Sequence, residues 1–266
     1  MVTGGTQHAP GPPNWQAIGM VKPQWIRVEE IFRYPKPARA SEHDVDGYPN
    51  FYNRTKSSRL EENLLQLESG INLVARVKGA DSVRRPLLLI RSSPWKAGTE
   101  GTPWHDQFDL AKRTVRYYGD HKVTTSGPVG STPGNGALLE AWSLHRSNRK
   151  GERALAPPLA IFRSAPTKDV KGRMQQKGYV EFCGIAFIRT LSHVTQRAPD
   201  SQREYPNIVL DLALIPLAET GERVNWQWVD DRRNGALTAT ESNHHAPAAW
   251  ERWVETGRCA QNQHTV

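Results

Sequence analysis

Cysteine is scarce in this chain of 266 residues, which contains only Cys183 and Cys259. Two cysteines build neither a disulfide framework nor a structural zinc site. The chain also lacks a run of 18 apolar residues, so no membrane-spanning helix is predicted. Residues 1–13 lack the cationic start and apolar block of a secretory signal. These absences favour a cytoplasmic protein with no membrane partner.

Metal and nucleotide motifs are also sparse. His244 and His245 are adjacent, so their side chains would point to different sides of a strand, and no second ligand pair follows at useful spacing. The glycines at 127–136 are not followed by the Gly-Lys-Ser/Thr of a phosphate-binding loop. We therefore expect no cofactor and no resident metal.

Positive charge is abundant, with 35 Lys and Arg against 27 Asp and Glu and a formal net charge of +8. For one domain this excess favours a polyanionic partner such as nucleic acid. The cations cluster in predicted loops rather than along a helix, which argues against a zipper or homeodomain reader and for loops projecting from a scaffold. The clusters are residues 84–85, 146–150, 168–177 and 232–233.

Strand patterns dominate the chain. Apolar and polar residues alternate in several segments, as in half-buried strands. Gly184 interrupts the long apolar run 179–188, which indicates a bulge or bend. Seven or so strands predict a mainly β, α+β fold: a curved sheet or barrel with a few peripheral helices. The predicted strands lie within residues 71–77, 87–90, 115–118, 159–162, 179–188, 208–215 and 226–229.

Three helices are predicted at the periphery. The capping box at 58–61 precedes a leucine stripe, and Asn135 is placed to cap a second helix. Pro247 fits the first turn of a third helix that Gly257 would end. We expect one domain over residues 25–258, with flexible tails at 1–24 and 259–266.

The most informative segment joins residues 104–108 (WHDQF) to residues 116–122 (RYYGDHK). It places aromatic faces, carboxylates and cations within twenty residues of predicted strand. A nucleobase flipped out of DNA needs these groups: rings to stack on, carboxylates to accept from exocyclic amines, and cations for the flanking phosphates.

The order of motifs along the chain carries a further signal. The motifs are residues 92–95 (SSPW), 102–106 (TPWHD), 116–122, 134–135 (GN), 156–163 (APPLAIFR), 178–188, 226–233 (WQWVDDRR) and 247–257. This order resembles the N-terminal recognition domain of prokaryotic modification-dependent restriction enzymes of the AspBHI/MspJI type, over roughly residues 25–257. The resemblance implies an SRA-like curved β-barrel, or SRA/PUA-like fold, that flips 5-methylcytosine out of double-stranded DNA.

The resemblance also implies roles for individual residues. The flipped base would lie between Trp95 and Tyr117, and Asp106 would read the cytosine amine. The hydrogen-bonding groups are complementary, because an ionised Asp only accepts hydrogen bonds and cytosine offers a donor at N4. Trp104, Tyr118 and Asp120 are expected to support the pocket.

Cations and polar loops are expected to hold the rest of the DNA. Contacts to the backbone and grooves are predicted for Arg54, Lys56, Arg116, Lys122, Lys171 and Gln175. The enzymes that the chain resembles also carry a C-terminal nuclease domain, whereas this chain ends soon after the recognition-like part. We therefore expect a reader without nuclease activity of its own, working alone or with a nuclease partner or effector domain.

Two other functions remain open. Asp106 or Asp109, followed by Asp120-His121-Lys122, matches the loose D…DxK pattern of magnesium-dependent nucleases. A general RNA or single-strand binder could use the same stacking residues without reading a modification. The preferred modification, the sequence context and the oligomeric state are not determined by the sequence.

Overall fold

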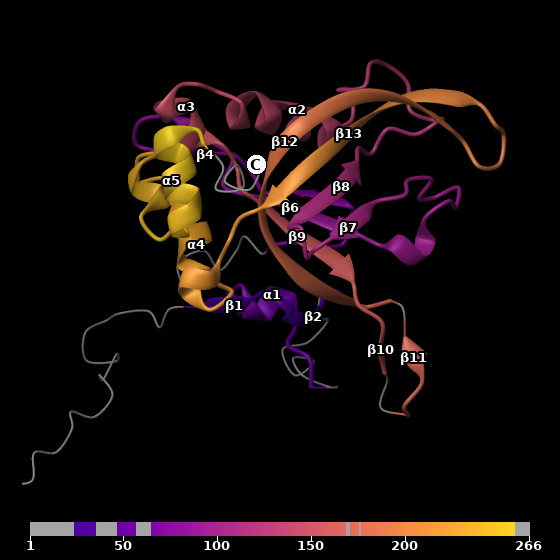
Figure 1. Cartoon of the computed structure of the whole chain (residues 1–266), viewed down its shortest axis with the longest axis horizontal. Helices are drawn as coiled ribbons and strands as arrows, with labels where there is room; N and C mark the ends of the chain where they lie inside the picture. The colour runs from indigo at the N-terminus through magenta and orange to yellow at the C-terminus, as the bar shows by residue number, and fades with distance from the viewer. Residues whose placement is uncertain (1–23, 36–46, 57–64, 169–170, 176, 259–266) are drawn as a thin grey trace, which may run out of the picture.

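The computed structural model describes residues 24–35, 47–56, 65–168, 171–175 and 177–258, and the statements below concern these residues. Their main feature is one large mixed sheet (Figure 1). Its strands, in spatial order, are β3 (Ile71–Leu73), β6 (Leu88–Ser92), β9 (Leu159–Ser164), β12 (Tyr179–Arg197), β13 (Glu204–Leu214), β8 (Thr114–Tyr118) and β7 (Gln107–Asp109), with β2 (Ile31–Arg33) beside the start of β12. Only β6 and β9 pair in parallel; the other pairs are antiparallel.

Two bulges shape the longest strand. The first lies at Cys183, next to Gly184, whose φ of +123° is readily available only to glycine, and the second lies at Arg189. Bulges bend a strand and increase its twist. Beyond the second bulge, β12 and β13 leave the body of the protein as a long curved hairpin (Figure 1). The glycine-based prediction of a bend inside this strand is confirmed.

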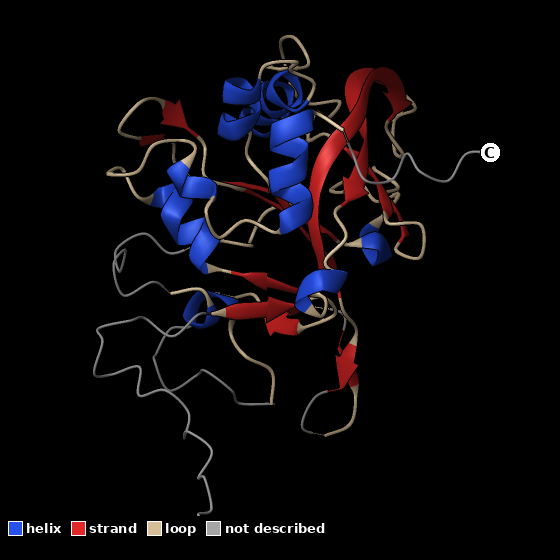
Figure 2. Ribbon diagram, turned by 60° about the vertical axis from the view of Figure 1, so that its left-hand side comes forward, coloured by secondary structure: helices blue, strands red, loops and turns tan. Residues whose placement is uncertain are grey.

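The central strands of the sheet are buried on both faces. Leu88 and Ile90 of β6 pack into one apolar cluster, which α2 (Pro133–His145) covers, while Leu89 packs into the other. The second cluster is covered by α1 (Phe51–Arg54), α3 (Lys150–Leu155), α4 (Gln227–Arg233) and α5 (Ala248–Thr256), and the helices on both sides of the strands are visible in Figure 2. Burial on both faces explains why β6 and β9 read as continuous apolar runs rather than as alternating ones.

Three short pairs complete the described strands. They are β1 (Trp25–Arg27) with β14 (Arg223–Asn225), β4 (Val77–Lys78) with β5 (Val83–Arg84), and β10 (Thr167–Lys168) with β11 (Met174–Gln175). Short 3₁₀ helices span Pro94–Lys96, Ala218–Thr220 and Glu241–Asn243. None of the described helices is long and apolar enough to cross a bilayer.

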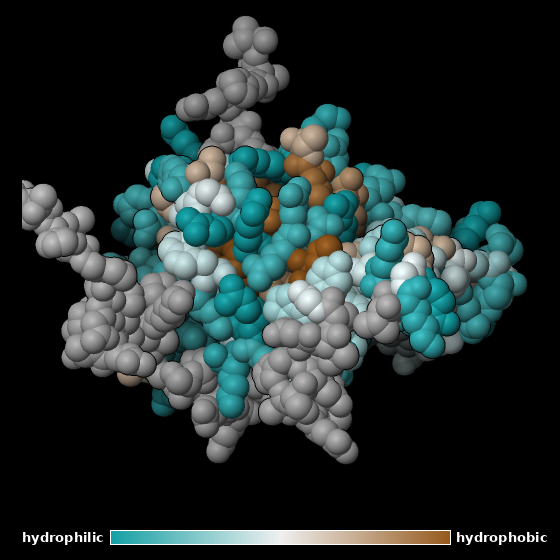
Figure 3. Space-filling model, turned by 90° about the horizontal axis from the view of Figure 1, so that it is seen from below, coloured by the Kyte–Doolittle hydropathy of each residue, from teal (hydrophilic) through white to brown (hydrophobic). Residues whose placement is uncertain are grey.

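The predicted β-rich α+β class is confirmed, but the described strands do not close into a barrel. The edge strands β3 and β7 do not pair with each other, so the sheet stays open at this seam. From below, the surface is mainly hydrophilic, with apolar residues gathered near the middle of that face (Figure 3). This surface agrees with the high charge of the sequence.

Several element predictions need correction. Residues 226–229 form no strand: Asn225 accepts a hydrogen bond from the backbone N–H of Gln227, and the chain enters α4. Thr132, not Asn135, caps α2. The predicted strand over 71–77 is split into β3 and β4. Residues 57–64 of the predicted leucine-striped helix lie outside the described part, and Leu65 and Leu67 are buried but not helical. The helix predicted after Pro247 is confirmed as α5, ended by Gly257.

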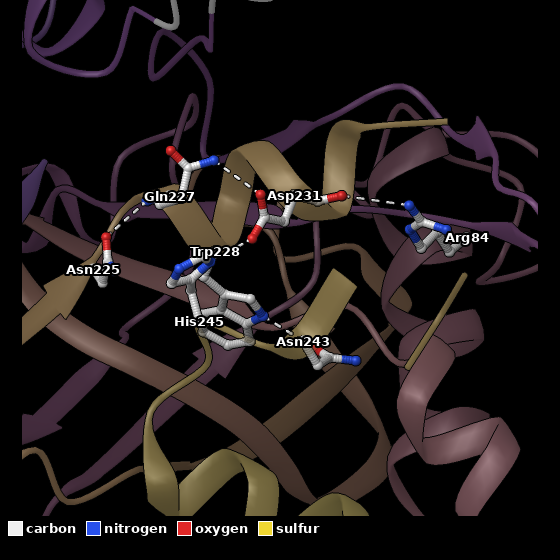
Figure 4. A network of polar contacts seen from close by, with 7 residues as sticks. All are labelled: Arg84, Asn225, Gln227, Trp228, Asp231, Asn243 and His245. Carbon is white, nitrogen blue, oxygen red and sulfur yellow. Dashed lines mark hydrogen bonds and ion pairs between the residues drawn. The ribbon is translucent and has the colours of Figure 1, made fainter. Parts of the chain in front are cut away.

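Two arginines that the sequence places in cationic loops are buried. Arg84 donates to the main-chain carbonyls of Asp231, Arg232, Asn234 and Leu237 at the end of α4. Arg232 is fully buried and donates to carbonyls including those of Pro86 and Ala156; burial and the charge of Arg84 lower its pKa to about 9. Figure 4 shows Arg84 at Asp231, whose carboxylate contacts His245. Residues 84 and 232 therefore hold the fold together and do not offer surface charge.

His145 joins α2 to the sheet. Its Nδ1 accepts from the backbone N–H of Ile188 at 2.9 Å, so Nε2 carries the proton that is donated to the carbonyl of Pro157 at 3.0 Å. Burial, together with the charge of Arg232, lowers the pKa of His145 to about 3. The imidazole is therefore neutral in the folded protein.

Acid should weaken the fold through His145. A lowered pKa gives stability that is complete above the unfolded value near 6.5 and is lost as the pH falls toward 3, about 2 kcal/mol of it by pH 5. Urea unfolding of wild-type protein and His145→Leu at pH 7.5 and pH 5 measures this effect. We expect the variant to have the lower free energy of unfolding at pH 7.5, and the difference from wild type to be about 2 kcal/mol smaller at pH 5. The exposed His193→Leu serves as control, and a constant deficit would contradict the assignment.

Candidate nucleic-acid interface

A cavity of about 490 Å³ lies where the two ends of the sheet approach each other. Its wall comes from the end of β6, the start of β3, the end of β8, the segment before β7 and the N-terminus of α2. Ligand pockets in proteins typically occupy about 300–1,000 Å³. Six residues predicted for DNA binding line it: Trp104, Asp106, Tyr117, Tyr118, Asp120 and Lys122.

Asp106 spans this seam. Its Oδ2 accepts from the hydroxyl of Ser92, the last residue of β6, at 2.7 Å. Its Oδ1 accepts from the backbone N–H of Tyr118, the last residue of β8, at 3.0 Å. Burial raises the pKa of Asp106 to about 6, although both hydrogen bonds oppose the shift. A desolvated carboxylate in a cavity wall is a strong acceptor for an incoming N–H donor.

Asp120 is fixed by the N-terminus of α2. Its Oδ1 accepts from the backbone N–H of Asn135 and from the hydroxyl of Thr132. The amide of Asn135 accepts from the backbone N–H of Asp120 and donates to Asn207, which itself donates to the carbonyl of Gly119. Asn135 and Asn207 are fully buried. This pair of amides fixes the turn that follows β8, and with it the cavity rim.

The aromatic residues divide into two groups. Tyr117 is buried at the cavity wall, where burial and the nearby Asp106 and Asp120 raise the pKa of its phenol well above the usual value. Trp104 and Tyr118 also line the cavity. Trp95 does not: it lies on the 3₁₀ helix Pro94–Lys96, with 41% of its surface exposed. The expected stacking of a base between Trp95 and Tyr117 remains a prediction.

The predicted backbone cations are spread over the surface. Arg54 donates to the carbonyl of Trp25 and pairs with Glu30. Arg116 lies on the face of β8 that lines a separate shallow hollow, 3.8 Å from Asp211. Lys56, Lys171 and Gln175 are not among the residues of the cavity wall. Of the predicted cations, only Lys122 belongs to it.

The structure brings together some of the residues of the D…DxK nuclease alternative. Asp106, Asp120 and Lys122 line one cavity, whereas Asp109 pairs with Lys112 at 3.0 Å beside the shallow hollow. Within the described ranges, no group of three or more His, Cys, Asp or Glu side chains is placed to hold a metal ion.

Several wall residues could not be found by sequence reasoning. Ser92 belongs to the motif at 92–95, but its bond to Asp106 depends on two segments 14 residues apart meeting across the seam. Arg91 and Lys96 carry no signal beyond their charge. The alternating pattern predicts Ile71 only as a core residue of a strand, yet it lines the cavity.

Known proteins share the fold of this chain. A family profile described as "Restriction endonuclease AspBHI N-terminal" matches residues 51–264. The solved structure "MspJI Restriction Endonuclease in Complex with 27-mer Oligonucleotide" is 46% identical, with a TM-score of 0.81. That match covers 90% of this chain and 53% of the MspJI chain, so the chain spans about half the length of that enzyme. A search of curated proteins gave no match.

Two further structures share the fold at lower identity. The "DNA recognition domain of the cytosine modification-dependent restriction endonuclease LpnPI" is 17% identical, with a TM-score of 0.58, and the match covers 95% of this chain and 96% of that one. The "DNA modification-dependent restriction endonuclease AspBHI" is 19% identical, with a TM-score of 0.58, and the match covers 88% and 91%. At these identities the likeness establishes the fold alone.

Replacing Gly119 by Ala should damage the cavity rim. A Cβ there would collide with Oδ1 of Asn135 and with Cγ1 of Ile208, both fixed by their surroundings. We expect a loss of about 1–3 kcal/mol in the free energy of unfolding. Gly101→Ala is the matched control, since nothing lies within 4 Å of the added carbon. Equal melting temperatures for the two variants would contradict the packing described.

Replacing Asp106 by Asn should stabilise the protein at alkaline pH. A carboxyl whose folded pKa is raised contributes stability that is complete below the unfolded value near 3.9 and is lost as the pH rises through about 6. Asn can still accept from Tyr118 and donate to Ser92. We expect the free energy of unfolding of the variant to exceed that of wild type by about 1–3 kcal/mol at pH 7.5. This difference should be about 2 kcal/mol smaller at pH 4.5, where the wild-type carboxyl is protonated in the folded state. Urea titrations at both pH values measure it; a less stable variant at pH 7.5 would show that the charge stabilises the fold.

Proposed function

Because the chain belongs to the AspBHI N-terminal family of restriction-endonuclease domains, we propose that it binds double-stranded DNA containing a modified cytosine and receives that base, flipped out of the duplex, in the Asp106 cavity. The observation that carries the proposal is the Asp106 carboxylate: desolvated, fixed by two donors and facing a cavity walled by tyrosines and a tryptophan.

The chemistry of the wall suits cytosine. Each oxygen of Asp106 accepts one hydrogen bond from the protein and retains a second lone pair, so it can accept from the N4 amine. Stacking on an aromatic ring is worth about 1–3 kcal/mol, comparable to the cost of unstacking a base. Trp95 would need to turn toward Tyr117 to complete the stack. Ile71 and Leu73 form an apolar part of the wall that could receive a 5-methyl group.

The relatives support this substrate. LpnPI is a cytosine modification-dependent restriction endonuclease, and the MspJI structure contains an oligonucleotide. Since the chain spans about half of MspJI, we propose that it is the recognition part and that cleavage is supplied by another domain or partner. We propose residues 25–258 as the extent of the recognition domain.

A titration of matched duplexes tests the proposal. One duplex carries a single 5-methylcytosine and the other plain cytosine, at fixed salt and with magnesium present. A buried methyl group is worth about 0.8 kcal/mol, so we expect at least a fourfold preference for the modified duplex. Asp106→Ala should weaken binding of the modified duplex by about tenfold or more, because the variant cannot make the hydrogen bond between the charged carboxylate and the base.

Asp109→Ala is the control, since this carboxylate lies outside the cavity and pairs with Lys112. Equal affinity of wild-type protein for both duplexes would overturn the modified-cytosine proposal and leave a general nucleic-acid binder. Magnesium-dependent cutting that Asp120→Ala abolishes would instead support the nuclease alternative.

A further inference from the structure

Three cations of the cavity wall each lie over an aromatic ring. The guanidinium carbon of Arg91 lies 4.2 Å from the ring centroid of Tyr34. Nζ of Lys96 lies 5.0 Å from the ring of Trp95, and Nζ of Lys122 lies 5.4 Å from the ring of Trp104. Lys96 and Trp95 are neighbours on one 3₁₀ helix, whereas the fold brings Arg91 to Tyr34 and Lys122 to Trp104 from separate segments.

The same three cations have no carboxylate partner in the described part of the chain. Arg91 donates to the carbonyl of Glu68, and Lys122 donates to the carbonyl of Gly101. The carboxylates of the wall, Asp106 and Asp120, are instead occupied by hydroxyl and backbone N–H donors. Among the described residues, none of the three cations is therefore held in an ion pair, although Asp106 and Asp120 line the same cavity.

A contact with a ring face holds a cation in place without using its N–H donors. Arg91 and Lys122 each donate one hydrogen bond to a main-chain carbonyl, which leaves four N–H donors on the arginine and two on that lysine for phosphate oxygens. By contrast, an arginine or lysine already paired with a carboxylate, as Arg116 is with Asp211, must give up that pair before it binds an anion. Three positioned cations around one cavity, with no ion-pair partner in the described part of the chain, favour an anionic ligand that extends beyond the base.

We infer that Arg91, Lys96 and Lys122 form a phosphate clamp that holds the DNA backbone on either side of the nucleotide in the cavity. The inference rests on the proposed function, and it adds Arg91 and Lys96 to the predicted Lys122. Since the clamp binds phosphates, it adds affinity for a nucleotide within a strand and does not distinguish modified from plain cytosine.

The salt dependence of binding tests the clamp. Removing one cation that binds a phosphate should reduce the slope of log K against log salt by about 0.9. Arg91→Met, Lys96→Met and Lys122→Met are each titrated with the modified and the plain duplex between about 50 and 200 mM salt, a range over which such effects are large. We expect the slope to fall by about this amount in each variant, with the ratio of the two affinities unchanged.

Two controls separate the clamp from bulk charge. Lys112→Met removes a cation that is paired with Asp109 outside the cavity, and its slope should match that of wild type. Lys96→Arg keeps the charge over Trp95 and should keep the slope. Thermal melting confirms that each variant is folded before its slope is interpreted.

The outcomes separate the two proposals. If wild-type protein prefers the modified duplex but the three clamp variants have the slope of Lys112→Met, the clamp is overturned and the proposed function stands. If the salt slopes of the three clamp variants fall but wild-type protein binds the modified and the plain duplex equally, the clamp is supported and the proposal of modified-cytosine recognition is overturned.

Discussion

The carboxylate of Asp106 links the two ends of the sheet. Ser92 ends the strand beside one edge, and Asp106 immediately precedes the strand at the other edge, so their hydrogen bond requires the sheet to curl until its ends meet. The strands do not pair across this seam, and the cavity occupies it. A closed barrel would satisfy every strand edge but would leave no opening here for a base.

Burying the carboxylate of Asp106 at the seam between the sheet ends costs free energy. Burial raises the pKa of Asp106 to about 6, so the ionised form that can read an amine opposes folding near neutral pH. The rest of the structure offsets this cost: two apolar clusters cover both faces of the sheet, and buried amides fix the turn after β8. An acceptor at the site is thus kept at the expense of local stability, a common arrangement at functional sites.

Much of the local structure could be predicted from sequence. Apolar runs located the central strands, Gly184 indicated the bulge, and Pro247 with Gly257 bounded α5. The failures have physical causes. Residues 226–229 are apolar enough for a strand, but Asn225 accepts a hydrogen bond at the start of α4, and the buried Arg84 donates to main-chain carbonyls at its end. Arg84 lies 148 residues before its partner Arg232, so a local pattern does not reveal this contact.

The sequence by itself determined the types of group at the site: Trp104, Asp106, Tyr117, Tyr118 and Asp120 stand in two short segments that a hairpin brings together. Only the tertiary structure decided which cations belong with them. Arg84 and Arg232 are buried among carbonyls, Arg116 pairs with Asp211, and Arg91, Lys96 and Lys122 surround the cavity over aromatic rings. Charge is a property of composition, but whether a charge is neutralised depends on neighbours that meet only in the folded chain, as Arg116 meets Asp211 on the adjacent strand.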